Sequence, residues 1–450
     1  MPVRRADPDS TGVDPYRRLS ASQVITWNTC PRLWYYSYIP KLKSPLPPQI
    51  LRGNAVEECI SRILRESPVY ISSSDIDKIA SPLNSDGSVA YDSDEGWVGP
   101  KLEVIPKENW PLNREQLFNW AVSRMEIHFD NCWNSAIIDW KSSPNRIGKS
   151  EDIDPDEGRQ MIIAGINLHL DQVELCLGSD GGPNFESWRR GEYRPEWPAP
   201  DGFPKKWNSL HPAAENHLSP MTWVEAWEVS RPWFVDPDGS SFTETTCHPN
   251  DWFQGEYDLV YRWTGKIRIV DLKASVGKGD RSGGYIEQLR LYSWIWWETH
   301  ARKDEVEGLE IWYLGPGTIK KVPMPSELEM SKYNDELEEL YLKIHSKVPD
   351  ISDCPPNPSP LRYFDVGGMP SDPPVDPNPK ARCEKCDLRG ICENSDYELV
   401  LPSENRLEKF SHAWPITSMD DIKTRHTVIG EVRELDGPNL NPDGTVDLSF

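Results

Sequence analysis

Two acidic residues and one lysine occur near the ends of two strand-like segments that a short turn connects. Asp258 comes late in the sequence WFQGEYDLVYRW, and Asp271 and Lys273 end the sequence KIRIVDLKAS that follows it. If the two segments pair as a hairpin, their acidic ends lie side by side. The i, i+2 spacing also places Asp271 and Lys273 on the same face of the sheet, so two carboxylates and an ammonium group converge.

This combination of groups predicts a site for a hard divalent cation. Mg²⁺ and Mn²⁺ prefer oxygen ligands and keep water molecules that can take part in chemistry. Lys273 would orient and help to deprotonate a metal-bound water, and would counter the charge that develops on a phosphate. A D-x-K tripeptide is common, however, and taken alone it is better explained by an exposed ion pair at a strand end.

The next segment predicts a helix with polar and basic side chains. Gln288 and Tyr292 are one helical turn apart and therefore share a face. Arg290 lies between them in the sequence, and Lys278 and Arg281 belong to the glycine-rich loop before the helix. These groups suit contact with a phosphate backbone, whereas an ordinary amphipathic helix is the alternative interpretation.

Three cysteines form a C-x2-C-x5-C run at positions 383, 386 and 392. This spacing brings three thiolates around one centre, as zinc sites and iron–sulfur clusters require. The run lacks a fourth ligand, for which the chain offers Cys30, Cys354 or His412. The remaining cysteines are predicted to be small buried or neutral residues, namely Cys59, Cys132, Cys176, Cys247 and Cys354.

The elements that must position these residues predict a mixed sheet covered by helices, because strand, strand, helix, strand, strand and helix follow one another between 251 and 346. Helices are also expected from Ser20 to Tyr35, over 53–65, 112–140 and 158–177, and strands at HTVIGEVREL and GTVDLSF near the C-terminus.

We divide the chain into a flexible lead-in (1–19), N-terminal helices (20–65), an insertion or subdomain of unknown role (66–250), a core (251–346), a proline-rich connector without regular elements and the cysteine knuckle (347–397), and a C-terminal β-rich segment (398–450).

Composition limits the classes of protein that the chain can represent. It has 450 residues, of which 37% are hydrophobic and 27% are charged, and it contains 20 tryptophans; this composition excludes the collagen, coiled-coil and disordered classes. The net charge is −23. No apolar run approaches the ~20 residues that span a bilayer, so we expect a soluble, cytoplasmic protein without a membrane partner. Nine cysteines do not suit a secreted disulfide framework.

The negative charge is unevenly distributed along the chain. Residues 1–65 hold ten Lys and Arg against five Asp and Glu, and residues 263–303 hold eight against four. These two basic segments contain the motifs described above, and they are the parts expected to meet a polyanion. An acidic surface adapted to high salt is the alternative explanation for the acid excess.

Six motifs in this order resemble the RecB-type nucleases of the PD-(D/E)XK superfamily. The resemblance is to the iron–sulfur branch, which includes the AddB nuclease domain and CRISPR-adaptation exonucleases, and it covers roughly residues 20–65 and 251–395. The motifs are Cys30 in C-P-x-x-x-Y-Y, Gly53-x-x-x-Glu57, Gly255-x-x-Asp258, Asp271-Leu272-Lys273, Gln288-x-x-x-Tyr292 and C-x2-C-x5-C.

The resemblance implies a restriction-endonuclease-like α/β fold, in which helices flank a mixed sheet and residues 251–346 are the catalytic core. Lys273 would be the catalytic lysine, and Gln288 and Tyr292 would position the lysine and DNA. Many relatives have histidine at the position of Glu57, so a carboxylate would replace imidazole as a metal ligand. The implied ligands of Mg²⁺ or Mn²⁺ are Glu57, Asp258, Asp271 and the main-chain carbonyl of Leu272.

The resemblance also implies a [4Fe–4S] cluster that clamps the two ends of the chain together, with Zn²⁺ as the alternative. Its ligands would be Cys30, Cys383, Cys386 and Cys392. Contacts to DNA are expected from the basic residues Arg32, Lys278, Arg281 and Arg290.

The expected activity is that of a metal-dependent phosphodiesterase. It would act as a DNA exonuclease on single-stranded or frayed ends with a metal-activated water, in DNA repair, recombination or CRISPR adaptation. A helicase or a repair or adaptation complex would be its protein partner. The alternatives are a non-catalytic nucleic-acid-binding or scaffolding module with the same fold, and a zinc-knuckle protein whose acidic surface meets basic partners.

Overall fold

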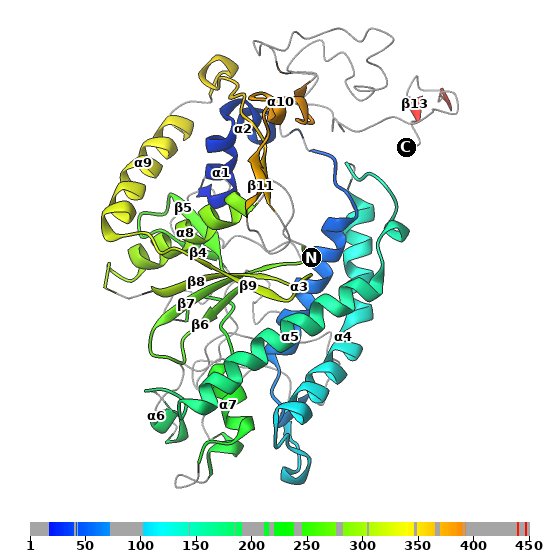
Figure 1. Ribbon diagram of the computed structural model, residues 1–450, viewed down its shortest axis with the longest axis vertical. Coiled ribbons are helices and arrows are strands. Elements are labelled where there is room, and N and C mark those ends of the chain that lie inside the picture. Colours follow the sequence, from blue (N-terminus) through cyan, green and yellow to red (C-terminus); the bar gives the residue numbers. More distant parts are fainter. Residues whose placement is uncertain are drawn as a thin grey trace.

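A four-stranded mixed sheet carries the acidic hairpin (Figure 1). It consists of β6 (Leu259–Tyr261), β7 (Ile267–Lys273), β8 (Val306–Tyr313) and β9 (Thr318–Val322), in this order. Neighbouring strands are antiparallel except for β7 and β8, which are parallel. A parallel connection needs a long crossover, and α8 (Ser282–Thr299) provides it. The predicted mixed sheet with helical cover is therefore confirmed.

The computed structural model describes residues 18–39, 42, 44–72, 102–143, 145–183, 185–190, 211–215, 220–237, 245–275, 282–303, 306–345, 349–364, 370–389, 392, 439–440 and 446–447. The expected strand HTVIGEVREL lies outside these residues. Near the C-terminus, β12 (Asn439–Leu440) and β13 (Val446–Asp447) form a short antiparallel pair.

A second, three-stranded sheet has the order β1 (Leu19–Ser20), β5 (Phe253–Glu256) and β4 (Thr245–Cys247). Strand β1 pairs in parallel with β5, and Leu19 is completely buried. Arg18 forms an ion pair of 2.5 Å with Asp251. The prediction that the flexible lead-in extends to residue 19 is thus wrong for residues 18 and 19, because they join the sheet.

The segment 252–263 is not one continuous strand, as the sequence analysis expected. It breaks at Tyr257 and Asp258, so β5 belongs to the three-stranded sheet and β6 to the four-stranded sheet. The hairpin partner is as expected, since Leu259 pairs with Val270 and Tyr261 with Arg268. The break leaves Asp258 outside both ladders.

Alternating residues of the four-stranded sheet enter two separate hydrophobic cores. On β7, Val270 and Leu272 contribute to one core, whereas Ile267 and Ile269 contribute to the other. The period of two follows from the pleat of a β-strand. Asp271 continues the Ile267–Ile269 side, which is the side of α8.

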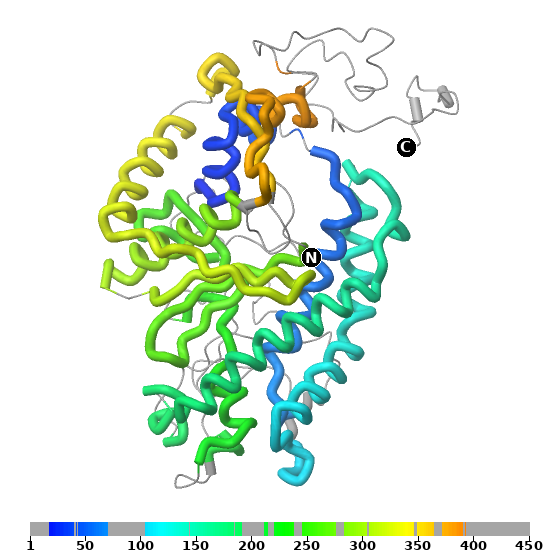
Figure 2. Tube along the Cα trace, in the orientation of Figure 1, coloured from blue at the N-terminus to red at the C-terminus, as the bar shows by residue number. Residues whose placement is uncertain are grey.

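Helices cover both faces of this sheet (Figures 1 and 2). The first core is built with α3 (Gln49–Arg65), α4 (Arg114–Ser142), α5 (Pro155–Gly178), α6 (Phe185–Arg189) and α7 (Trp223–Ser230). The second is built with α1 (Ala21–Thr29), α2 (Pro31–Tyr38), α8 and α9 (Glu327–His345). The helices expected at 53–65, 112–140 and 158–177 are confirmed with small shifts of their ends. None of the described helices is both long and apolar enough to cross a membrane.

The helix expected from Ser20 to Tyr35 is divided at Cys30. Ser20 caps α1 as predicted, because its hydroxyl accepts a hydrogen bond of 3.4 Å from the Gln23 N–H. Cys30 is extended, with φ −165° and ψ 111°, because a residue before proline avoids the helical region. Pro31 then begins α2 at its first position, where a missing N–H costs nothing.

The proline-rich connector contains regular structure that the sequence analysis did not expect. β10 (Arg362–Phe364) and β11 (Pro370–Val375) form an antiparallel pair. Two-stranded sheets have only edge strands, where proline is tolerated. Two further short elements lie in this part of the chain, the 3₁₀ turn Ile351–Asp353 and α10 (Ala381–Glu384).

Several short elements complete the described fold. β2 (Tyr70–Ser72) and β3 (Leu102–Val104) pair in antiparallel fashion after α3. Three 3₁₀ turns lie within the segment predicted as an insertion, at Lys107–Asn109, Ser150–Asp152 and Pro212–Glu215. Because α4, α5 and α7 share one core with α3 and the sheet, this segment supports the helix that carries Glu57.

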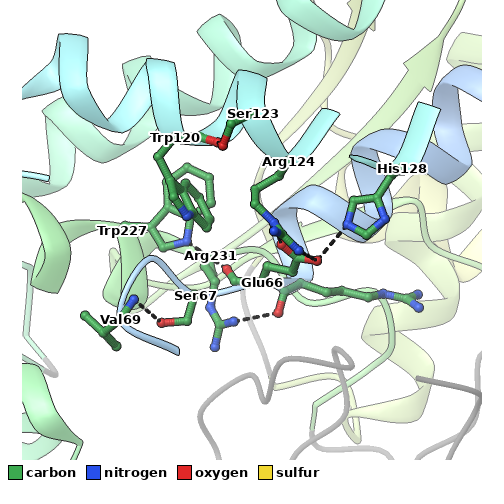
Figure 3. Close-up of polar contacts among 10 residues, drawn as sticks. Glu66, Ser67, Val69, Trp120, Ser123, Arg124, His128, Trp227 and Arg231 are labelled. Carbon is green, nitrogen blue, oxygen red and sulfur yellow. Dashed lines mark hydrogen bonds and ion pairs between the residues drawn. The ribbon is translucent and has the colours of Figure 1, made fainter. Parts of the chain in front are cut away.

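The C-terminal end of α3 is fixed by a polar network around Glu66 (Figure 3). The Glu66 carboxylate pairs with Arg124 and lies 2.6 Å from His128 Nε2. The Trp227 Nε1–H donates a 3.0 Å hydrogen bond to the Glu66 carbonyl. Burial alone would raise the pKa of Glu66, but the hydrogen bonds from His128 and Arg124 lower it overall.

We predict that Glu66→Gln lowers the free energy of unfolding by about 3 kcal/mol at neutral pH, because it removes the negative charge that pairs with Arg124 and replaces one of the two accepting oxygens by a donor. Since the folded pKa of Glu66 lies below the ordinary value of 4.5, this advantage of the wild type is complete above pH 4.5. It decreases as the pH falls through the folded pKa. Urea unfolding at a series of pH values measures both effects.

Glu58→Gln on the same helix is the matched control, because the Glu58–Arg62 pair is partly exposed. It should change stability by less than about 0.5 kcal/mol. An equal loss in the two variants would contradict the role assigned to Glu66.

Candidate active site

Asp258 and Leu272 meet where the first strand of the hairpin is broken. The Leu272 N–H donates a hydrogen bond of 2.9 Å to Asp258 Oδ2. Strand β6 begins only at Leu259. The Asp258 carboxylate therefore accepts the hydrogen bond that a backbone carbonyl of a longer β6 would have accepted from the Leu272 N–H. The N–H and C=O of a strand residue face the same neighbour, and the Leu272 carbonyl therefore faces the same side as Asp258. The prediction that the acidic ends lie side by side is confirmed.

Asp271 and Lys273 form a buried ion pair on the α8 face of β7. Asp271 is only 1% exposed, and its Oδ2 lies 2.7 Å from Lys273 Nζ. The ammonium group also lies over the ring of Tyr285 on α8, 4.9 Å from the ring centre. The two side chains share a face, as their spacing predicted.

Burial and neighbouring charges shift the pKa of both groups. Burial and the negative charge of Asp258 raise the pKa of Asp271 to about 7, which the opposite charge of Lys273 only partly offsets. Burial alone would lower the pKa of Lys273, but the charges of Asp271, Asp258 and Glu57 raise it overall. Three carboxylates therefore act on one ammonium group, and this end of β7 has an excess of negative charge.

A small cavity of about 30 Å³ adjoins Asp258 on the α3 side of the sheet. Three of the predicted metal ligands line it, namely Glu57, Asp258 and Leu272. A cavity of this size holds about one water molecule or one ion. Glu57 comes from α3, so the helix approaches the hairpin from the face opposite to α8.

Asp271, the fourth predicted ligand, does not line this cavity, although it lies close enough to Asp258 to interact with it electrostatically. Its buried Oδ1 has no hydrogen-bond partner among the described residues. A bound cation would satisfy this oxygen.

The oxygen donors present here fit Mg²⁺ or Mn²⁺. Within the described part of the chain, no three His, Cys, Asp or Glu side chains form a ready metal site. A bound ion would therefore also need the Leu272 carbonyl and water molecules.

Gln288 and Tyr292 lie together on α8, and the Gln288 Nε2–H donates a 3.0 Å hydrogen bond to Tyr292 Oη. Both side chains line a cleft of about 830 Å³ between α1, β5 and α8. Gly255 on β5 lies directly against the tyrosine, since a Cβ at this position would be 3.0 Å from Tyr292 Cε1. A side chain on β5 would therefore displace the Tyr292 ring.

Hydroxyl groups and one arginine form the other side of this cleft. Ser22, Thr26 and Thr29 of α1 line it, together with Tyr285 of α8 and Arg382 of α10. The Arg382 side chain is oriented by Ser359, whose hydroxyl accepts a 2.7 Å hydrogen bond from the Arg382 Nε–H. These residues of α1 and α10 were not predicted as site residues from the sequence.

The predicted DNA-binding arginines have partners within the protein. Arg32 is buried, and its side chain donates hydrogen bonds to the carbonyls of Cys354 at 2.7 Å and Ile351 at 3.1 Å. These contacts join α2 to the connector, so the expectation that Arg32 contacts DNA is corrected. Arg290 pairs with Glu329 of α9 at 2.7 Å. The predicted residues Lys278 and Arg281 lie outside the described residues.

The four cysteines predicted as cluster ligands come from both ends of the described fold. Cys30 lies between α1 and α2, and its Sγ accepts a 3.4 Å hydrogen bond from the Asn357 N–H of the connector. Burial raises the pKa of the Cys386 thiol to about 12, and the charges of Cys30 and Cys392 act in the same direction. Burial also raises the pKa of Cys383, again with a contribution from Cys30.

Four of the other cysteines are buried, namely Cys59, Cys132, Cys176 and Cys354. Cys247 is half-buried. Cys354 is completely buried in the core, and its carbonyl accepts a hydrogen bond from Arg32.

The structure adds two residues to the cavity that the sequence analysis missed. Ser61 and Arg65 line it beside Glu57. The three follow one another at intervals of four, so they lie on one face of α3. The four-residue interval in GNAVEECISRILR could have indicated that Ser61 and Arg65 share a face with Glu57. By itself, however, Arg65 resembles a basic residue at the end of any helix.

We predict that Gly255→Ala lowers the free energy of unfolding by about 1–3 kcal/mol, because the added Cβ collides with the buried Tyr292 ring. Gly283→Ala, where a Cβ meets nothing within 4 Å, should be neutral or stabilising, since alanine favours a helix. Thermal unfolding of the two variants measures the difference. An unchanged melting temperature in Gly255→Ala would contradict the close approach of β5 to α8.

Comparison with known proteins is limited to part of the chain. No curated protein and no solved structure matches it. A family model described as the PD-(D/E)XK nuclease superfamily matches residues 186–393. The match includes the break between β5 and β6, the D-L-K sequence and α8, and it begins after Glu57. Residues 186–393 thus have the sequence pattern of the PD-(D/E)XK nuclease superfamily, and the mixed sheet flanked by helices is consistent with its fold.

Proposed function

We propose that the protein is a metal-dependent DNA nuclease that acts as an exonuclease on single-stranded or frayed ends. The observation that carries this proposal is the convergence of Asp258, Asp271 and Lys273 at the end of β7, beside a cavity lined by Glu57 and the Leu272 segment. The superfamily match over the same strands supports the reaction class. Such an enzyme would process DNA ends in repair, recombination or CRISPR adaptation, alongside a helicase or an adaptation complex.

Glu57, Asp258, Asp271 and the Leu272 carbonyl would hold Mg²⁺ or Mn²⁺. When bound, the ion would polarise the scissile phosphate and acidify an attacking water. Asp258 is fixed for this task by the Leu272 N–H, and Asp271 by burial.

Lys273 would counter the negative charge that develops on the phosphate. Its ammonium group is held by Asp271 at 2.7 Å and lies over the Tyr285 ring, so its position does not depend on substrate. A pre-positioned charge of this kind stabilises a transition state without reorganisation. Tyr285 and Lys273 also connect the hairpin with the cleft beside α8.

The cleft between α1, β5 and α8 would hold the DNA strand. Arg382 and the hydroxyl groups of Thr26 and Thr29 offer donors to phosphates, and Tyr285 offers an aromatic ring to a base. Gln288 and Tyr292 line this cleft, and Tyr292 lies close enough to Asp258 to interact with it electrostatically. The end of a DNA strand bound in the cleft would thus lie at the acidic hairpin.

We predict that end-labelled single-stranded DNA is degraded in Mg²⁺ or Mn²⁺, and that Asp271→Ala and Lys273→Ala each reduce the rate at least 100-fold. Lys321→Ala on the edge strand β9 is the control, because this lysine is exposed and distant in the sheet order. Release of labelled mononucleotides would identify an exonuclease and its polarity. If the wild type binds DNA but does not cut it, the protein is a binding or scaffolding module.

We also propose that Cys30, Cys383, Cys386 and Cys392 bind a [4Fe–4S] cluster. The proposal is supported by the electrostatic interaction of the Cys386 thiol with Cys392 and with Cys30, which lies more than 350 residues away in the sequence. Thiolate ligands suit both iron–sulfur clusters and zinc. Bound metal would tie the N-terminal helices to the connector, which already contact each other through Arg32 and Asn357.

Cys386→Ser should lose iron, labile sulfide and brown colour, and should unfold at a lower temperature, because metal binding is coupled to folding. Cys247→Ser is the control, since Cys247 is half-buried on β4 and outside the proposed ligand set. Metal analysis of protein purified without oxygen measures the content. Zinc without iron or sulfide in the wild type would contradict the cluster and leave a zinc knuckle.

A further inference from the structure

Tyr285 in the first turn of α8 lies next to both Lys273 and the cleft. The Lys273 ammonium group is 4.9 Å from the centre of the Tyr285 ring. Tyr285 also lines the cleft between α1, β5 and α8, whereas Lys273 is not among the described residues that line it. The ring therefore lies between the ammonium group and the cleft. This arrangement indicates which base of a bound strand meets the ring.

The helix that carries Tyr285 is connected to the opposite wall of the cleft. Gln288 and Tyr292 follow Tyr285 on the same face of α8, line the cleft as well and share a 3.0 Å hydrogen bond. The Asn28 Nδ2–H of α1 donates a 2.7 Å hydrogen bond to Glu287 Oε1 of α8. The aromatic wall and the hydroxyl-bearing wall of the cleft are thus held at a defined separation.

The ring of Tyr285, and not its hydroxyl group, makes the contact that matters here. The hydroxyl group has no hydrogen-bond partner among the described residues, whereas the ring contacts Lys273. The side chain is only half-buried and lines the cleft, so part of its aromatic surface is open to a ligand. Aromatic surfaces in clefts for single strands bind bases by stacking, which accepts every base because each has a π-face.

Lys273 marks the place of the proposed reaction, because its ammonium group also forms the 2.7 Å ion pair with Asp271. A base on the cleft side of the Tyr285 ring is separated from this ammonium group by the ring alone. The sugar of the same nucleotide joins that base to a phosphate. This phosphate is therefore the one of the strand that lies nearest to Lys273.

We propose that Tyr285 stacks on the base of the terminal nucleotide, next to the phosphodiester that the site cleaves. Stacking places this phosphodiester at Lys273 without reading the identity of the base. The enzyme would then remove any of the four nucleotides but discriminate against an end that lacks its base. The inference rests on the proposed nuclease function and adds a specificity-determining residue to it.

Oligonucleotides that lack one terminal base test this inference. A tetrahydrofuran abasic analogue replaces the nucleotide at the 5′ end or at the 3′ end, and the unmodified single strand is the reference. With Mn²⁺, we expect the wild type to release the unmodified terminal nucleotide at least fivefold faster than the abasic one, at the end where degradation begins. In EDTA, fluorescence anisotropy of short strands should show at least threefold weaker binding of the same abasic strand.

Three variants assign the discrimination to the ring. Tyr285→Leu removes the ring and should cleave the two ends at rates within twofold of each other. Its rate on the abasic end reports on the position of Lys273, whereas the ratio of the two rates reports on stacking. Tyr285→Phe keeps the ring and should keep the preference of the wild type. If Tyr285→Leu does not fold, Tyr285→Met serves instead, because its flexible side chain fills a similar space.

Tyr333→Leu is the matched control for the loss of a tyrosine. Tyr333 is also half-buried, and the Arg290 guanidinium group lies 5.9 Å from its ring centre. It is not among the described residues that line the cleft. This variant should therefore retain at least a fivefold preference for the unmodified end.

The outcomes separate this inference from the proposed function. If the wild type cleaves both ends equally well, the inference is wrong and the nuclease remains. A preference that persists in Tyr285→Leu would also overturn it, because another residue would then contact the base. Loss of the preference in Tyr285→Phe would contradict stacking, because the hydroxyl group would then make the contact. If the wild type does not cleave DNA with any divalent metal, the proposed function fails and the inference with it.

Discussion

The hydrogen bond from the Leu272 N–H to the Asp258 carboxylate is the contact on which the site depends. It forms because the chain leaves one sheet at Glu256 and enters another at Leu259, so that Asp258 has no partner strand. A side chain then satisfies the backbone donor that a longer strand would have satisfied. The same break directs the Leu272 carbonyl and the carboxylate to one side, where a cation can reach both.

Two helices complete the site from opposite faces of the sheet. Helix α8 is the crossover between the parallel strands β7 and β8, and it places Tyr285 over Lys273. Helix α3 contributes Glu57 and Arg65, and α4, α5 and α7 pack in the same core as α3. The segment 66–250 thus supports the site by packing against α3, the helix that carries Glu57. On the far side, Arg32 and Asn357 connect the N-terminal helices to the connector that carries the cysteine knuckle.

Local patterns in the sequence predict much of this arrangement. The turn between two strands and the period of two along β7 suffice to bring Asp271 and Lys273 together beside Asp258. The break at Tyr257 could not be predicted, because WFQGEYDLVYRW has a strand-like composition along its whole length. Only the packing of the two sheets determines where the strand divides. Arg32 shows the same limit, since its charge suggested DNA, whereas its partners are backbone carbonyls from residues 351 and 354. Arg65 was overlooked because the sequence does not reveal that Phe234 and Arg231 hold it beside the cavity.

The position of a bound metal ion tests this account most directly. A crystal of the protein grown with Mn²⁺ would give an anomalous difference map at the manganese absorption edge. We predict one strong peak between Glu57, Asp258 and the Leu272 carbonyl, with Asp271 within reach of it directly or through water, and its loss in Asp258→Asn. The absence of a peak at the end of β7 at millimolar Mn²⁺, or a peak unaffected by Asp258→Asn, would contradict the account.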